Sequence, residues 1–124
     1  MPPWVLRRDI EPRCALGAAG GGDVRIDKLL RLSRASRCAI HGIASVGLDP
    51  GRGLPRFNMP FEPCLDMGCR TFGDRDATRK RVLVPDRERY RYQVFLSDIA
   101  GQDIRAHRGD ADTVATVMRN RLRP

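Results

Sequence analysis

Glu62 stands in a mostly apolar stretch of the chain, GLPRFNMPFEPCLDMGCR, which runs from residue 53 to residue 70. An ionised carboxylate in apolar surroundings needs a partner, an exposed helix end or a chemical role. The chemistry open to it is to stabilise, or to attack, a positive charge that develops on a reacting group. We therefore take Glu62 as the candidate catalytic residue. The alternative is that it only caps or decorates the start of a helix.

Five other side chains are candidates for binding a substrate beside Glu62. Arg56 is suited to phosphate groups, because a guanidinium forms paired hydrogen bonds with them. Phe57 and Phe61 offer aromatic faces that would shield a reacting group or stack on a planar ligand. Asn58 has a second explanation, since asparagine is also a good N-cap. His41 has one too, as a hydrogen-bonded histidine of the core.

Composition indicates one globular domain over residues 1–124. The chain is long enough for one core, and its hydrophobic fraction of 41% argues against wholesale disorder. No apolar run approaches the ~20 residues that span a bilayer, and the N-terminal run has no long apolar signal sequence. We expect a cytoplasmic protein with no membrane partner.

The cysteines and histidines do not have the spacing of a metal site. No CxxC pair is present, and the histidines are His41 and His107. Two of the cysteines, Cys14 and Cys38, fall in strand-like apolar runs, where a free thiol behaves as a small hydrophobe. We expect no metal, and reduced cysteines in the core.

The net charge of +8 raises the question of nucleic-acid binding. Basic residues are scattered through every segment, however, and acidic residues are interleaved with them. A binding face would show clustered bases with stacking aromatics and few acids. The run 79–81, followed by Tyr90 and Tyr92, is the nearest approach to one. A solvated, arginine-rich surface is the favoured interpretation, so a nucleic-acid partner is not expected.

Strand-like and helical patterns alternate along the chain. Short apolar runs predict strands over residues 12–16, 38–46, 81–86 and 103–107, with Pro85 ending the third. Amphipathic or capped patterns predict helices over residues 24–37, 60–70, 92–101 and 110–122. A loop rich in Gly and Pro separates the second strand from the second helix.

This alternation predicts an α/β domain with a mostly parallel sheet and helices on both faces. The strands 38–44 and 81–85 are expected to be adjacent or nearly so. Ligands of such sheets bind beyond the carboxyl ends of the strands. Glu62, which follows a strand and the loop 47–59, is therefore expected near the site, facing a crevice formed with that loop.

Asn58 and the Phe61–Glu62 pair, after a strand and a loop rich in Gly and Pro, resemble the N-x-x-[FY]-E-L-G element of TIR-like domains. The longer runs SRCAIHGIASV, GLPRFNMPFE and RYRYQVFLSDIAGQDIRAH look like a bacterial branch of the same superfamily, over residues 12–122. The resemblance implies a flavodoxin-like, three-layer domain, an architecture shared with nucleoside 2-deoxyribosyltransferases.

The resemblance also implies a function. Active members cleave the N-glycosidic bond of NAD or a nucleotide, often in bacterial antiphage defence, and their essential glutamate matches Glu62. NAD or a related nucleotide would be the substrate, with no further cofactor. Two alternatives stay open: a non-catalytic nucleotide-sensing or protein-interaction module, and a basic nucleic-acid-associated protein, whose binding would depend steeply on salt.

TIR-like domains open with a central strand and helix, often written F-I-S-H-S, and nothing in this chain matches that opening. We expect residues 1–11 to be irregular, and the sheet to lack its first strand through truncation at the N-terminus. An unpaired strand edge promotes association. A homo-oligomer, or a partner chain that completes the sheet, is therefore expected.

Overall fold

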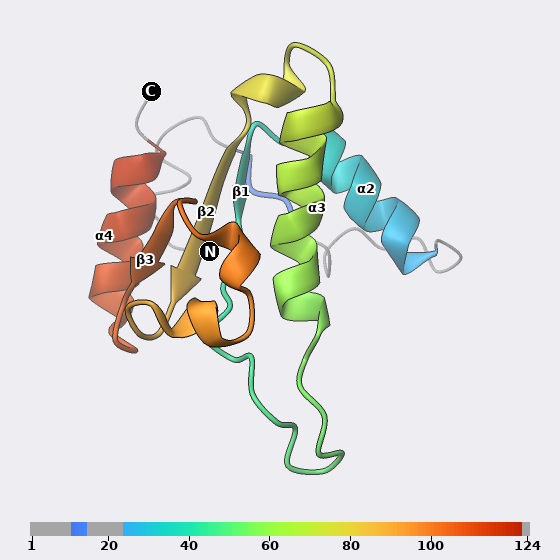
Figure 1. The fold of residues 1–124 in the computed structure, drawn as a ribbon. Helices are drawn as coiled ribbons and strands as arrows, with labels where there is room; N and C mark the ends of the chain where they lie inside the picture. Colours follow the sequence, from blue (N-terminus) through green and yellow to red (C-terminus); the bar gives the residue numbers. More distant parts are fainter. Residues whose placement is uncertain (1–10, 15–23, 123–124) are drawn as a thin grey trace.

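The computed structural model describes residues 11–14 and 24–122 of the chain. Its described part contains a three-stranded sheet in the order β1-β2-β3, in which both neighbouring pairs are parallel. The strands are β1 (Cys38–Ile40), β2 (Arg81–Asp86) and β3 (Ile104–Ala106). The predicted α/β class, the parallel sheet and the adjacency of the second and third predicted strands are confirmed (Figure 1).

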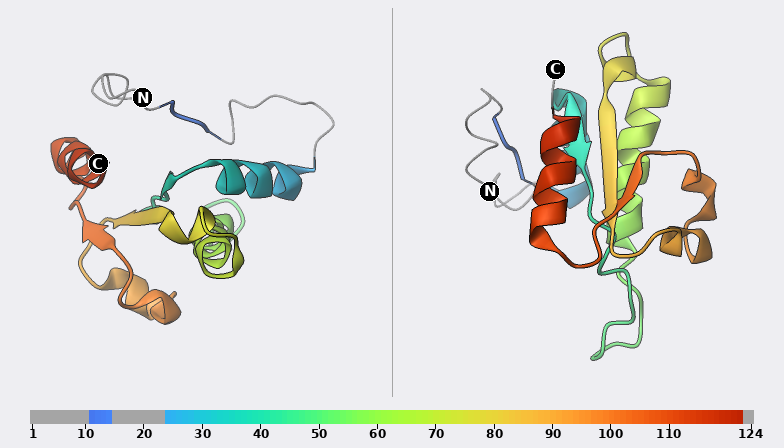
Figure 2. Two further views of the ribbon diagram at one scale, coloured as in Figure 1. Left: turned by 90° about the horizontal axis from the view of Figure 1, so that it is seen from above. Right: turned by 90° about the vertical axis from the view of Figure 1, so that its left-hand side faces the viewer.

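Helices lie on both faces of this sheet (Figure 2). The α-helices are α2 (Arg25–Ala35), α3 (Asn58–Phe72) and α4 (Ala111–Arg121), and the 3-10 helices are η1 (Ala77–Arg79), η2 (Arg91–Val94) and η3 (Ser97–Ile99). One face is covered by α3 together with η2 and η3, and α4 lies against the other. The helix α2 packs beside α3.

The core is centred on β2. Val82 and Val84 of this strand are buried, together with Ile43, Tyr92 and Ile99. A middle strand of a parallel sheet is covered on both faces, which explains why its apolar residues are consecutive rather than alternating. The prediction that Pro85 ends this strand is wrong. The Pro85 carbonyl accepts a hydrogen bond from the Ile43 backbone N–H at 3.0 Å, and the strand continues to Asp86.

Most of the predicted elements are present with shifted ends. The helix predicted over 24–37 is α2, the one predicted over 60–70 extends at both ends to form α3, and the strand predicted over 103–107 is β3. The closing helix is α4, and Asp110 caps it, because its side chain accepts from the Thr113 backbone N–H at 2.8 Å.

Three local predictions are wrong. Residues 92–101 form the short 3-10 helices η2 and η3 instead of one helix. Residues 12–14 have no regular structure, while the rest of the predicted first strand, and residues 1–10, lie outside the described residues. The cysteines are free but not in the core: Cys14, Cys38 and Cys64 are exposed and Cys69 is half-buried. Cys38 begins a strand at the edge of the sheet, where burial is incomplete.

None of the helices in the described part of the chain is long and apolar enough to cross a membrane.

Candidate functional site

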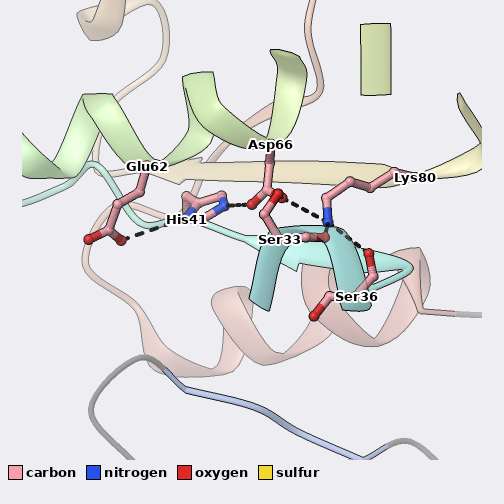
Figure 3. A network of polar contacts seen from close by, with 6 residues as sticks. All are labelled: Ser33, Ser36, His41, Glu62, Asp66 and Lys80. Carbon is pink, nitrogen blue, oxygen red and sulfur yellow. Dashed lines mark hydrogen bonds and ion pairs between the residues drawn. The ribbon is translucent and has the colours of Figure 1, made fainter. Parts of the chain in front are cut away.

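The helix α3 carries two carboxylates, Glu62 and Asp66, on one face. A separation of four residues places side chains on the same side of an α-helix, and both turn toward His41 (Figure 3). The helix begins at Asn58, two residues before the predicted start at residue 60. Glu62 is therefore the fifth helical residue. It lies beyond the first turn, where the stabilising effect of a helix N-terminus on a carboxylate has fallen off.

Asp66 is 4% exposed and is held by three side chains from different elements. The Ser33 hydroxyl of α2 donates to one of its oxygens, and the ring of His41, which follows β1, contacts the other. The ammonium of Lys80, just before β2, lies 2.7 Å from Oδ1. Asp66 thus joins α2, α3 and both ends of the β1–β2 pair.

Lys80 is buried, and each of its three N–H donors has an acceptor. Besides Asp66, its Nζ donates to the carbonyls of Ser33 at 2.6 Å and of Ser36 at 2.7 Å. These carbonyls belong to the C-terminal end of α2, where backbone acceptors are left without helical partners and a cation is favoured. Lys80 therefore stabilises a helix end and a buried carboxylate at once.

The pKa of Asp66 reflects competition between burial and hydrogen bonding. Burial by itself would raise the pKa, because it disfavours the charged form. Hydrogen bonds from His41, Lys80 and Ser33, with the positive charge of Lys80, more than offset this and lower the pKa to about 2. Asp66 is accordingly ionised at neutral pH and acts as an acceptor.

His41 lies between the two carboxylates (Figure 3). Its backbone N–H donates to the Leu83 carbonyl at 3.0 Å, so the hydrogen bonding between β1 and β2 continues to His41. Because Asp66 accepts at Nε2, a neutral ring carries its proton there and leaves Nδ1 as an acceptor. Nδ1 lies 4.0 Å from Glu62 Oε2. Two acceptors at this separation can share one group with two donor hydrogens, such as a water molecule.

Glu62 forms the accessible end of this network. Its side chain is 25% exposed, and its other oxygen lies 4.0 Å from the guanidinium of Arg25 on α2. The carboxylate therefore has a cationic partner on one side and an imidazole on the other. Both are contributed by segments distant in the sequence. The structure brings together Glu62 and His41 from the predicted set of site residues.

The other predicted site residues lie where the chain enters α3. Arg56, Phe57, Asn58 and Phe61 are exposed, and the two phenylalanines expose 67% and 48% of their surface, so they form no apolar enclosure. Asn58 is not the N-cap, since Phe57 occupies that position without a capping side chain. The loop leading into α3 projects from the body of the molecule (Figure 1). The Glu62 carboxylate lies 4.0 Å from Arg25 and from His41, which belong to other segments.

Sequence reasoning missed Ser33, Asp66 and Lys80. The sequence held a signal for Asp66 and one for Lys80, but none for Ser33. Asp66 follows Glu62 by one helical turn, and Lys80 is one of only two lysines among 23 basic residues. A lysine in such an arginine-rich chain indicates a position where a compact ammonium fits and a planar guanidinium does not. Its burial also removes the central cation from the basic run 79–81.

A second buried carboxylate, Asp86, ends β2. One of its oxygens accepts from Arg91 Nη2 at 2.6 Å and Nε at 3.0 Å, and from the Arg87 backbone N–H at 2.7 Å. Arg91 also donates to the carbonyls of Ile43 at 2.8 Å and Val46 at 3.3 Å. The other oxygen of Asp86 is buried and has no hydrogen-bond partner among the described residues. This pair fastens the segment after β1 to the end of β2.

Two further observations bear on ligands. In the described ranges, no group of three or more His, Cys, Asp or Glu side chains is arranged to hold a metal ion. A hollow of about 340 Å³ is lined by residues of β3 and α4, on the face of the sheet opposite α3: Arg105, Val117, Asn120 and Arg121.

The site therefore combines a partly exposed carboxylate, an imidazole whose far nitrogen is fixed by a buried aspartate, and a neighbouring guanidinium. Such a set can hold and deprotonate a water molecule and stabilise positive charge on a bound substrate. Comparison of the chain with protein-family models, with curated proteins and with solved structures finds no match in any of the three.

Proposed function

We propose that this chain is a nucleotide-handling domain similar to the TIR-like and nucleoside 2-deoxyribosyltransferase-like superfamily, and that it hydrolyses the N-glycosidic bond of NAD or a related nucleotide. The observation that carries the proposal is the position of Glu62, at the surface and 4.0 Å from the accepting nitrogen of His41. A flavodoxin-like arrangement is part of the proposal. The parallel sheet with helices on its two faces is compatible with it.

In the proposed reaction, Glu62 and His41 have different roles. As the bond from ribose C1′ to the base nitrogen breaks, its electron pair leaves with the base and positive charge develops on the sugar. The Glu62 carboxylate stabilises this charge. A water molecule held between Glu62 and His41 attacks C1′ and gives a proton to His41 Nδ1. With NAD, the products are free nicotinamide and the remaining ribosyl nucleotide, and the proton taken up by His41 is released to solvent; with a neutral nucleotide, that proton goes to the departing base.

The buried residues would support His41 rather than touch the substrate. Asp66 orients the ring and stabilises the positive charge that it gains, as a carboxylate behind a histidine does in other hydrolytic sites. Lys80 keeps Asp66 ionised through their 2.7 Å contact. Arg25 and Arg56 are available for phosphate groups, and the exposed rings of Phe57 and Phe61 for stacking on a base.

Replacement of the central carboxylate tests this function. Glu62→Gln keeps the side-chain shape but removes the charge, so release of nicotinamide from NAD should fall by at least 100-fold, about 3 kcal/mol in the barrier. Chromatography of free nicotinamide measures it. Glu88→Gln, at an exposed acid after β2, is the matched control and should keep full activity. Equal turnover in the two variants, or none in the unmodified protein, would contradict the proposal.

The second candidate function is a non-catalytic nucleotide-sensing or protein-interaction module. Glu62 already has two partners, Arg25 and His41, and the hollow described above lies on the opposite face of the sheet. Under this alternative, calorimetry would detect nucleotide binding without turnover. The affinity would then change little in Glu62→Gln.

A further inference from the structure

The connection between β1 and α3 ends in a projecting tip, which we define as residues 47–57. Figure 1 shows this segment extending away from the sheet and helices. Three large apolar side chains on it are mostly exposed: Leu48 at 70%, Leu54 at 62% and Phe57 at 67%. Exposed apolar side chains that lie together on a projecting loop commonly mark a contact with a membrane or another protein. Because the loop projects, it can insert into an apolar surface but cannot enclose a partner.

The backbone of the tip is held by its own hydrogen bonds. Leu48 and Pro55 form an antiparallel bridge, and the Asp49 backbone N–H donates to the Leu54 carbonyl at 2.9 Å. The Asp49 carbonyl accepts from Gly53, whose φ of +65° suits glycine. The tip is thus a closed turn with several of its polar groups already paired. Such pairing lowers the cost of moving backbone out of water.

The charge of the tip is positive. In its one acid, Asp49, the side chain accepts from the Gly51 backbone N–H at 2.8 Å and the Arg52 backbone N–H at 3.2 Å. Arg52 and Arg56 are exposed. Apolar side chains flanked by arginines are complementary to a bilayer with anionic headgroups, because the apolar groups can reach the acyl chains while the arginines pair with the headgroup phosphates.

We propose that the tip docks on an anionic phospholipid surface, with Leu48 and Leu54 in the interfacial region and Arg52 at the phosphates. This replaces the expectation of no membrane partner and does not depend on the proposed reaction. A second copy of the chain is a poorer occupant, because two chains of net charge +8 repel one another. An acidic peptide is a poorer one as well, since it binds a groove and the tip is convex.

Sedimentation with vesicles tests this. The unmodified protein should bind vesicles of equal parts phosphatidylcholine and phosphatidylglycerol, bind phosphatidylcholine alone at least tenfold more weakly, and be released by salt, which screens the charges. Leu48→Ser with Leu54→Ser should lower the affinity for the mixed vesicles at least tenfold, and Arg52→Glu should also lower it. The matched control is Phe72→Ser with Val94→Ser, at side chains 88% and 90% exposed outside the tip, and it should bind normally.

Each other outcome overturns the inference. No binding to the mixed vesicles, or equal loss in the tip and control variants, would show that the tip is not a lipid-docking element. Concentration-dependent self-association that only the tip variants abolish, without vesicle binding, would assign the tip to an interface between copies. Circular dichroism confirms that each variant is folded.

Discussion

Asp66 and Asp86 are both buried carboxylates paired with a cation, yet they are held in different ways. Asp66 accepts from side chains of three segments and leaves His41 directed at the partly exposed Glu62. Asp86 relies on one side chain, Arg91, and on one backbone N–H, and only one of its oxygens is used. The first network ends at the Glu62 carboxylate, and the second closes on backbone carbonyls. We infer that Asp66 supports the candidate site and that Asp86 supports the fold.

The largest expected effect comes from removing the cation beside Asp86. Arg91→Ala leaves a fully buried charge with a backbone N–H as its remaining partner, and it also removes a donor from the Ile43 and Val46 carbonyls. We expect a loss of about 3–5 kcal/mol in the free energy of unfolding, measured with urea. Lys80→Ala should cost less, about 2 kcal/mol, because the Ser33 hydroxyl and the His41 ring still donate hydrogen bonds to Asp66.

The control for both variants is Lys28→Ala, at the other lysine of the chain, which should change stability by no more than about 0.5 kcal/mol. A greater loss for Lys80→Ala than for Arg91→Ala would reverse the comparison. Asp66 would then depend on Lys80 alone.

The next effect is on the pH dependence of stability. The pKa of folded Asp66, about 2, lies below its ordinary value of 3.8, so this group contributes stability above the unfolded value and loses it as pH falls through about 2. The contribution is roughly 2 kcal/mol. Urea unfolding between pH 5 and pH 2 should show this fall in the unmodified protein. Asp66→Asn should lack that component, and identical pH profiles would mean that Asp66 is not held as described.

The smallest effect is expected from Ser33→Ala. It removes one neutral donor from Asp66 while the contacts with Lys80 and His41 remain, so the free energy of unfolding should fall by about 1 kcal/mol. Nicotinamide release should change less than in Glu62→Gln, because Ser33 lies on the far side of Asp66 from Glu62. A loss of stability as large as that of Arg91→Ala would show that Lys80 and His41 cannot hold Asp66 without the Ser33 hydrogen bond.

The sequence by itself determined the fold class and most of its elements. The apolar run over β2, the amphipathic pattern of α2 and the capping aspartate of α4 are local signals, and each element formed where its signal lay. The parallel sheet followed from the alternation of these elements, because parallel strands need crossover connections. Local signals failed where they were weak: Pro85 lies inside a strand, since its carbonyl still serves the ladder, and residues 92–101 split into two short turns of 3-10 helix.

The site was determined only in part. Glu62 was chosen as a candidate from its setting in the sequence. Its partners Arg25 and His41 lie 37 and 21 residues earlier in the chain, so no local sequence pattern predicts these contacts. Lys80 looked like one charge of a basic surface run. Tertiary structure decided that it is buried against Asp66, because the end of α2 and the start of β2 meet there and their polar groups require a compact cation. Local patterns fix helices and strands, whereas the pairing of buried charges depends on which segments the fold brings together.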